Sequence, residues 1–214
     1  MRASFLKTKP MMALAMPFVL VLGFLLALAA SPAMAANPSE QFISENVQKG
    51  IAILNNAQLS KDQRKAQFRD FLLSLTDIEA IGRYTLGQYR RTASASDMAE
   101  FDTTFRDYAV AVYQSYFNKY TGQTLQVTGS YVLNSEETVV KTVVVDPKKP
   151  ASKPIQVDFR VLNQKGRFLI ADFAAEGVWI RELERNDFTG YLGQNGGNLQ
   201  QLIAMLKKKT ALYH

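Results

Sequence analysis

The chain has 214 residues, of which 47% are hydrophobic and 21% are charged. This composition is typical of one folded domain, or of one domain with an appendage, and not of a disordered or collagen-like chain. There is no cysteine, and the only histidine is His214. The sequence therefore excludes disulfide scaffolds, cysteine-based zinc and iron–sulfur sites, thiol nucleophiles and any catalytic triad built on an internal histidine.

Residues 1–35 have the three-part layout of a secretory signal peptide. Three basic residues precede an apolar run over 11–30, and Ser31-Pro32 then leads to an Ala33-Met34-Ala35 cleavage sequence. We predict export to the periplasm with cleavage near Ala35. An uncleaved membrane anchor is the alternative, because about 20 apolar residues are just enough to span a bilayer.

The positive charge of the chain is partly due to this segment. Three of the 25 basic residues and none of the 19 acidic residues lie in 1–35, which leaves a formal net charge of +3 for residues 36–214. Such a small net positive charge does not indicate a nucleic-acid partner.

Residues 36–214 are predicted to form a single domain that begins with helices. Apolar residues recur at helical spacing over 39–55 and 97–120, and Ser60 and Thr76, each followed three residues later by Gln or Glu, are predicted to start two further helices. Ser94 or Ser96 is the expected cap of the long helix. A last helix is expected after Asn198.

The period then changes from helical to alternating. Strands are predicted at 124–132, 138–145, 155–162, 168–173 and 178–180, followed by a short helix over 183–192. Helices followed by an antiparallel meander and a C-terminal helix indicate an α+β fold, with the N-terminal helices packed against one face of a curved sheet.

Two strand carboxylates are the candidates for acid–base chemistry. Asp158 and Asp172 have apolar neighbours, and alternation places them on the face opposite Val157 and Phe173, which favours solvated side chains. If the sheet curls, one of them faces inward and titrates abnormally. No phosphate-binding glycine loop is present in the sequence, and no cofactor or metal is predicted.

The supply of aromatic residues is the most informative feature of the composition. The chain has 13 Phe, nine Tyr and one Trp, a large number for one helix layer on one sheet. They either fill a core with tyrosines at its rim, or line an apolar cleft that the helix and sheet leave open for a ligand.

Several blocks resemble one known family in composition and order. They are FRDFLLSLTDIEAIGRYTLGQYRRTAS at 68–94, FDTTFRDYAVAVYQSYFNKYTG at 101–122, DFAAEGVWIRELERNDF at 172–188 and YLGQNGGNLQQLIAMLKKK at 191–209. Together they resemble the MlaC/toluene-tolerance auxiliary family of periplasmic lipid carriers. The Asn195-Gly196-Gly197 element is similar to the hopanoid-associated HpnM branch.

The resemblance implies an NTF2-like α+β fold whose interior accepts the acyl chains of a phospholipid or hopanoid, without a catalytic step. It also implies two partners: an inner-membrane ABC lipid transporter with an MCE protein, and an outer-membrane lipoprotein complex. Two positions depart from the family. Phe168 stands where a tryptophan is common, and Trp179 stands where a small residue is common, so Trp179 is expected to narrow or reshape the pocket.

A carrier of this kind needs an apolar lining, because exposing two acyl chains to water costs on the order of 20 kcal/mol at about 0.8 kcal/mol per methylene. Arg90 and Arg91 are the candidates for contact with the head group, and surface charge is their alternative role. The predicted lining consists of Leu72, Leu75, Ile78, Ile81, Tyr84, Phe105, Tyr108 and Val112 on helices, and of Val143, Val157, Phe159, Ile170 and Phe173 on strands.

Two other classes of function remain open on the sequence. One is an NTF2-like hydrolase or isomerase for an apolar substrate, with Asp158 or Asp172 as the base. The other is a periplasmic adaptor with a closed, fully packed interior. The volume and lining of an interior cavity distinguish the three hypotheses.

Overall fold

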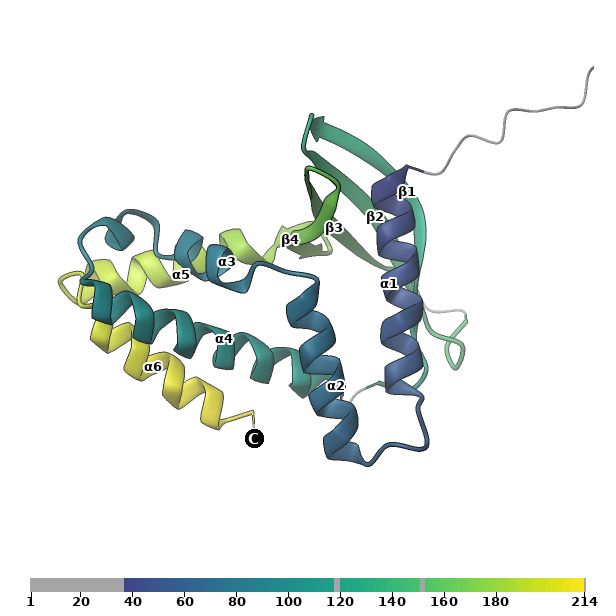
Figure 1. The fold of residues 1–214 in the computed structure, drawn as a ribbon, viewed down its shortest axis with the longest axis horizontal. Helices are drawn as coiled ribbons and strands as arrows, with labels where there is room; N and C mark the ends of the chain where they lie inside the picture. Colours follow the sequence, from purple (N-terminus) through teal and green to yellow (C-terminus); the bar gives the residue numbers. More distant parts are fainter. Residues whose placement is uncertain (1–36, 118–119, 151–152, 214) are drawn as a thin grey trace, which may run out of the picture. The chain divides into compact units, whose positions relative to one another are not determined.

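The computed structural model describes residues 37–117, 120–150 and 153–213, so the predicted signal peptide lies outside the described residues. Helices and then strands follow each other as predicted (Figure 1). The elements are α1 (Pro38–Leu54), α2 (Lys61–Ser74), α3 (Ile78–Thr85), the 3₁₀ helix η1 (Gly87–Arg91), α4 (Ala95–Phe117), β1 (Thr124–Asn134), β2 (Glu137–Val145), β3 (Ile155–Gln164), β4 (Arg167–Ala175), β5 (Val178–Trp179), α5 (Ile180–Gln194) and α6 (Leu199–Ala211). The α+β class is confirmed.

Local side-chain hydrogen bonds explain where the helices begin. The predicted capping box of α2 is present: Ser60 Oγ accepts from the backbone N–H of Gln63 at 3.2 Å, and the Ser60 N–H donates to Gln63 Oε1 at 2.9 Å. Ser94 caps α4, as one of the two predicted alternatives. The predicted N-cap of α3, Thr76, was wrong by one residue. The N-cap is Asp77, whose carboxylate accepts from the Ala80 N–H.

The five described strands form one antiparallel sheet in the order β1-β2-β3-β4-β5. Its regularity is broken by register shifts in the β1–β2 pair and by one between Arg160 and Val161 of β3, where Ala171 of β4 is the extra residue. Such β-bulges bend the strand that carries them and redirect its side chains. The predicted curvature of the sheet therefore has a visible cause.

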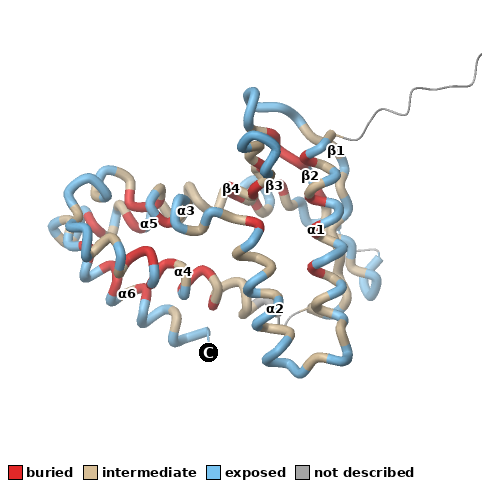
Figure 2. Tube along the Cα trace, viewed as in Figure 1, coloured by how far each residue is buried: buried red, intermediate tan, exposed pale blue. Residues whose placement is uncertain are grey.

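Two separate clusters of buried apolar residues hold these elements together (Figure 2). One lies between α1 and the sheet, around Ile43, Val140 and Val161. The other lies among α3, α4, α5 and α6. Its buried members include Phe105 of α4, Phe188 of α5 and Leu202 of α6. The first of the two cavities described below has walls from both clusters, and the second borders the cluster between α1 and the sheet.

A backbone hydrogen bond connects α2 to the sheet beside the first of these cavities. The backbone N–H of Ile170 donates to the carbonyl oxygen of Leu75 at 2.8 Å, next to the bulge at Ala171. The end of α2 is thereby fixed to β4. Among the described helices, none has the length and apolar character needed to cross a membrane.

Candidate functional site

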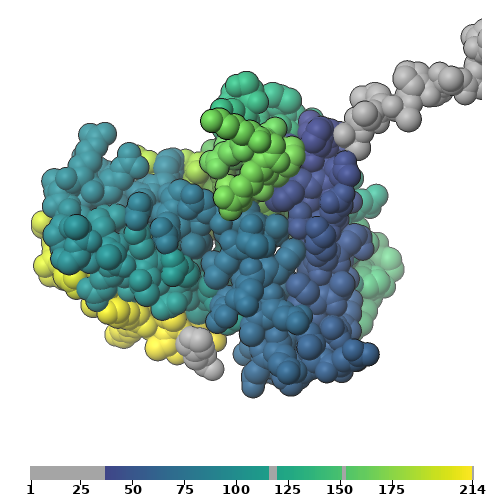
Figure 3. Space-filling model, in the orientation of Figure 1, coloured from purple at the N-terminus to yellow at the C-terminus, as the bar shows by residue number. Residues whose placement is uncertain are grey.

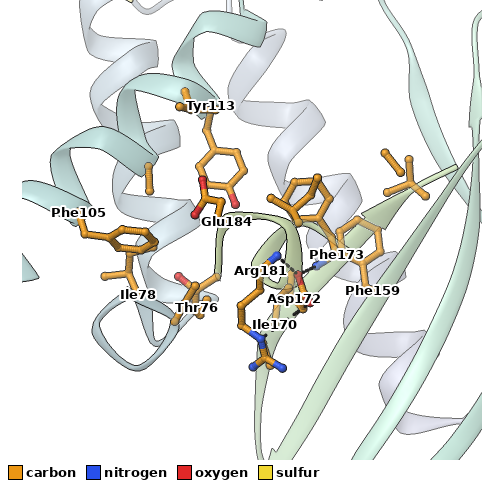
Figure 4. Close-up of a pocket in the computed structure, with 17 residues that line it drawn as sticks. Thr76, Ile78, Phe105, Tyr113, Phe159, Ile170, Asp172, Phe173, Arg181 and Glu184 are labelled. Atoms are coloured by element: carbon orange, nitrogen blue, oxygen red, sulfur yellow. Dashed lines mark hydrogen bonds and ion pairs between the residues drawn. The ribbon is translucent and has the colours of Figure 1, made fainter. Parts of the chain in front are cut away.

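The first cavity lies between the two cores and has a volume of about 460 Å³. Its walls come from α3, α4, the start of α5 and the strands β3 and β4. In Figure 4, Phe105 and Ile78 lie on the helical side and Phe159 and Phe173 lie on the strand side. The full lining is Thr76, Ile78, Ile81, Phe105, Ala109, Val112, Tyr113, Val157, Phe159, Ile170, Ala171, Asp172, Phe173, Ala175, Ile180, Arg181 and Glu184.

The second cavity lies between α1, α2 and the sheet and has a volume of about 540 Å³. The side chains of α1 and α2 meet on the outer surface, where Figure 3 shows the two helices side by side. None of the described residues that line this second cavity is charged: they are Ile43, Asn46, Val47, Gly50, Ile51, Leu54, Phe68, Phe71, Leu72, Leu75, Tyr120, Gln123, Thr124, Leu125, Val144, Val157, Phe159 and Ile170.

The two cavities adjoin. Val157, Phe159 and Ile170 line both of them, and the Leu75–Ile170 hydrogen bond lies beside this boundary. Each cavity falls within the range of roughly 300–1,000 Å³ that is usual for small-molecule sites. Together they form an apolar interior with walls from both halves of the fold, which is the geometry that a lipid needs.

Most of the residues predicted as lining are brought together here. Those on the first cavity are Ile78, Ile81, Phe105, Val112, Val157, Phe159, Ile170 and Phe173, and those on the second also include Leu72 and Leu75. Ten of the predicted residues therefore line one or both of the two adjoining cavities. Their role in binding a lipid remains a prediction.

Three predicted lining residues are not among the described residues that line either cavity. Val143 lies on β2, but the neighbouring Val144 is the one that faces the second cavity, because successive strand side chains point to opposite faces. Tyr108 is buried in the helical core against Phe105. Tyr84 lies beside the guanidinium groups of two arginines of α5.

The predicted head-group residues also lie elsewhere. Arg90 and Arg91 belong to η1 and are exposed, and they line a separate surface depression with Arg83, Met98 and Asp102. The arginine that lines the first cavity is Arg181, which the sequence analysis did not select. It stacks over the ring of Tyr84 at 4.2 Å, and Arg185 does so at 4.6 Å.

The expectation that Asp158 and Asp172 are solvated was wrong. Their exposed fractions are 9% and 4%. Asp158 accepts from Gln156 Nε2 at 2.9 Å. Asp172 follows the bulge at Ala171, which breaks the alternation, so that both Asp172 and the adjacent Phe173 line the first cavity.

Asp172 anchors the first turn of α5. Its Oδ1 accepts from the backbone N–H groups of Phe173 at 2.8 Å and Arg181 at 2.9 Å, which satisfies a donor that the helix terminus leaves free. Burial raises the pKa of this carboxyl, while the Arg181 N–H and guanidinium oppose the increase. A structural role accounts for one of its oxygens; the other, Oδ2, is buried without a hydrogen bond to any described residue.

Glu184 is the residue of this site that the sequence analysis missed. Its side chain points toward Tyr113 in the first cavity (Figure 4). Burial raises its pKa to about 7, with Asp187 and Asp172 adding to the increase and Lys209 and the Tyr108 hydroxyl opposing it. The sequence contained a signal for this residue: positions 180, 184, 188 and 192 are spaced four apart on α5, and Glu184 is the polar member of a row otherwise made of Ile180, Phe188 and Leu192.

The departures at Phe168 and Trp179 leave both cavities apolar. Trp179 is not among the described residues that line them, so the expected narrowing is not seen; its ring packs under the Arg160 guanidinium at 4.7 Å. Phe168 stacks on Phe42 of α1 at 5.7 Å and joins the sheet core.

Comparison with known proteins agrees with this geometry. The chain is similar to the intermembrane phospholipid transport system binding protein MlaC of Haemophilus influenzae, with 21% identity over 73% of this chain and 74% of the relative. Its fold is similar to that of a phospholipid-binding protein from Ralstonia solanacearum solved in complex with a phospholipid, with a TM-score of 0.70, 16% identity and coverage of 81% of this chain and 97% of the other. The family model described as MlaC protein matches residues 44–208, and the chain therefore belongs to the MlaC family.

Proposed function

We propose that this protein is a periplasmic phospholipid carrier that holds acyl chains in the two adjoining cavities and catalyses no reaction. The observation that carries the proposal is the pair of adjoining, largely apolar cavities, which share Val157, Phe159 and Ile170 in their linings. Membership of the MlaC family and the phospholipid named for both relatives support it.

The energetics explain why such a carrier is needed. Moving a two-chain lipid through water exposes apolar surface at a cost on the order of 20 kcal/mol. The cavities offer an equivalent apolar surface inside the protein. In the proposed cycle, the carrier exchanges lipid with an inner-membrane ABC transporter that carries an MCE protein, and with an outer-membrane lipoprotein complex. A hopanoid is the alternative cargo.

A lipid-loading assay tests the proposal. Purified protein is incubated with phosphatidylethanolamine–phosphatidylglycerol vesicles and separated from them, and its bound lipid phosphorus is measured. Val157→Asp places a carboxylate where the cavities meet and is expected to lower loading about tenfold or more, because a buried charge without a partner is costly. Lys148→Asp, on an exposed loop, is the control and should load like the wild type.

A second variant protects the test against loss of the fold. Leu72→Asp lies on α2, all of which is described and none of which is buried, and it lines the second cavity. Its circular dichroism should match that of the wild type while its loading falls. Wild-type protein that takes up no lipid, or Asp variants that load normally, would overturn the proposal.

An enzyme acting on an apolar substrate is the second candidate, because Glu184 places a carboxyl with a pKa of about 7 against an apolar cavity. If it is a general base, the protein hydrolyses p-nitrophenyl palmitate and Glu184→Gln abolishes turnover. Equal, background rates for both proteins support the carrier. The packed adaptor is disfavoured by the two cavities.

A further inference from the structure

The β1–β2 hairpin exposes three consecutive apolar side chains near its turn. Tyr131, Val132 and Leu133 are 44%, 64% and 46% exposed, and no other three consecutive large apolar residues are exposed in the part of the chain that the structure describes. None of the three lines either cavity. Single exposed apolar residues are normal on a protein surface, whereas a contiguous group marks a contact with another molecule.

These side chains lie on both sides of the hairpin. Successive strand residues point to opposite faces, so Tyr131 and Val132 lie on different faces of the sheet. A register shift between Val132 and Asn134 leaves Leu133 as an extra residue of β1, without a partner on β2. A flat protein surface would cover one side of this hairpin and leave the other in water. The interfacial region of a bilayer, which surrounds whatever enters it, would cover all three side chains.

A second hairpin ends beside the first. The β1–β2 and β3–β4 turns lie at the same end of the sheet, near the start of α1 (Figure 1). The backbone N–H of Asn163 donates to the carbonyl oxygen of Glu136 at 2.7 Å, which connects the two turns. Each hairpin closes through two residues, at 135–136 and at 165–166. Such short turns hold the exposed side chains in place and so reduce the conformational entropy lost on binding.

Positive charge lies at this end of the sheet. Lys165 and Arg167 are exposed, and neither forms an ion pair with a described residue. Lys141 Nζ lies 5.2 Å from the centroid of the Tyr131 ring. Glu136 is the exposed carboxylate of the two turns. The excess of cations favours an anionic partner, and each basic residue near an anionic lipid surface strengthens binding by about fivefold.

We propose that this end of the sheet docks on the surface of an anionic phospholipid bilayer. Tyr131, Val132 and Leu133 enter the interfacial region, and Lys165 and Arg167 meet the lipid phosphates. Such a surface matches both the apolar side chains on two sides of a hairpin and the cations beside them. The docking surface is separate from both cavities, so the inference goes beyond the proposed function. The few side chains engaged make the contact weak and reversible, as a carrier that must leave the membrane requires.

Vesicle co-sedimentation tests the proposal. The protein lacks its predicted signal peptide, because that apolar segment would itself bind vesicles. It is mixed with vesicles of phosphatidylglycerol and phosphatidylcholine in equal parts, or of phosphatidylcholine alone, and the bound fraction is measured. Binding to the anionic vesicles is expected to be about tenfold stronger or more, since at least two basic residues contribute. High salt should weaken it by screening these charges.

Variants at exposed positions locate the contact. Val132→Glu and Leu133→Glu should each weaken binding to anionic vesicles by about tenfold or more, because each replaces an apolar contact with a charge of the wrong sign. Arg167→Glu should weaken it by about fivefold or more. Leu212→Glu is the control for exposed apolar residues, since Leu212 is 78% exposed at the end of α6. Lys148→Asp is the control for charge, at the opposite end of the sheet. Both controls should bind like the wild type.

The outcomes separate this inference from the proposed function. Wild-type protein that does not sediment with anionic vesicles, or that binds both kinds equally, would overturn the inference. So would Val132→Glu and Leu133→Glu proteins that bind like the wild type, which would leave the hairpin to a protein partner. Loading with phospholipid from detergent micelles is measured on the same proteins, and Val132→Glu should load normally. A wild type that loads but does not dock contradicts only the docking surface, and one that docks but does not load contradicts only the proposed function.

Discussion

Glu184 illustrates how one residue departs from the pattern of its helix. The other residues of its row on α5, Ile180, Phe188 and Leu192, are apolar and at least half-buried. A carboxyl at this position meets the apolar wall of the first cavity, which disfavours its charged form. This placement costs stability whenever the group ionises, which makes the pH dependence of folding a direct test of its environment.

The free energy of unfolding should decrease as pH rises through the range in which Glu184 titrates. Its pKa is raised from 4.5 to about 7, so the folded chain holds this proton more tightly than the unfolded chain does. The loss begins above the unfolded pKa and is complete above about pH 8, with a total of about 3 kcal/mol. The raised pKa of Asp172 contributes in the same direction.

Urea denaturation at about pH 5 and about pH 8 measures this loss. Glu184→Leu should remove most of the difference between the two values, and Glu184→Gln should do the same without removing hydrogen bonding. Because Asp172 is intact in both variants, a small slope of the same sign should persist. A wild-type stability that rises over this range would show that Glu184 is ionised at no cost.

Gly82 is a second residue whose role is set by a close contact. A Cβ atom added here would lie 2.6 Å from Cδ1 of Phe105, a residue that is 2% exposed and lines the first cavity. Gly82→Ala is therefore expected to destabilise the protein by about 1–3 kcal/mol, since Cγ and Cδ1 of Phe105 belong to a stiff ring, and moving it disturbs its packing on Phe101 and Phe188.

Gly190 provides the matched control for this change. It lies within α5, and no described atom would lie within 4 Å of its Cβ. Gly190→Ala should stabilise the protein by about 0.5–1 kcal/mol through helix propensity alone. Thermal denaturation of the two variants should give shifts of opposite sign; a Gly82→Ala variant as stable as the wild type would contradict the close packing of α3 on α4.

At the scale of elements, α2 differs from the other helices that line the interior. Each residue of α2 is described and none is buried, yet Phe68, Phe71 and Leu72 line the second cavity. α4 lies deep in the helical core, with Phe101 and Phe105 almost fully buried. α2 therefore has few buried apolar contacts to hold it closed, a property associated with low local stability.

Amide hydrogen exchange should reflect this difference. In protein stripped of lipid, the amides of α2 are expected to exchange faster than those of α4, and loading with phospholipid should slow exchange in α2 more than in α4 because the lipid supplies missing apolar contacts. Ser60→Ala, which removes the capping box, should speed exchange in α2 further. Exchange in α2 that is unaffected by lipid would place the ligand outside the second cavity.

At the scale of the whole molecule, hydrophobic periodicity predicted the order of helices and strands because each element buries one face. The family resemblance, together with the apolar residues of these elements, led to the predicted lining, of which ten residues line the two cavities. The failures have a common cause, since they depend on register and tertiary packing. Val143 and Val144 point to opposite faces of the sheet, and only Val144 lines a cavity. The bulge at Ala171 brings Asp172 to the first cavity.

The division into two adjoining cavities was beyond the reach of the sequence for the same reason. It arises because β3 and β4 present Val157, Phe159 and Ile170 to helices from both halves of the chain. No local pattern encodes which helices will meet those three side chains. Glu184 was detectable in principle as the polar member of an apolar row, but only once the length of α5 was known.

Native mass spectrometry of protein purified from cells tests most directly whether the two adjoining cavities hold a lipid. The account predicts a mass above that of the same polypeptide measured under denaturing conditions, and release of a phospholipid or hopanoid on activation in the gas phase. Protein from cells that is consistently free of lipid, and that stays so after incubation with phospholipid vesicles, would contradict it.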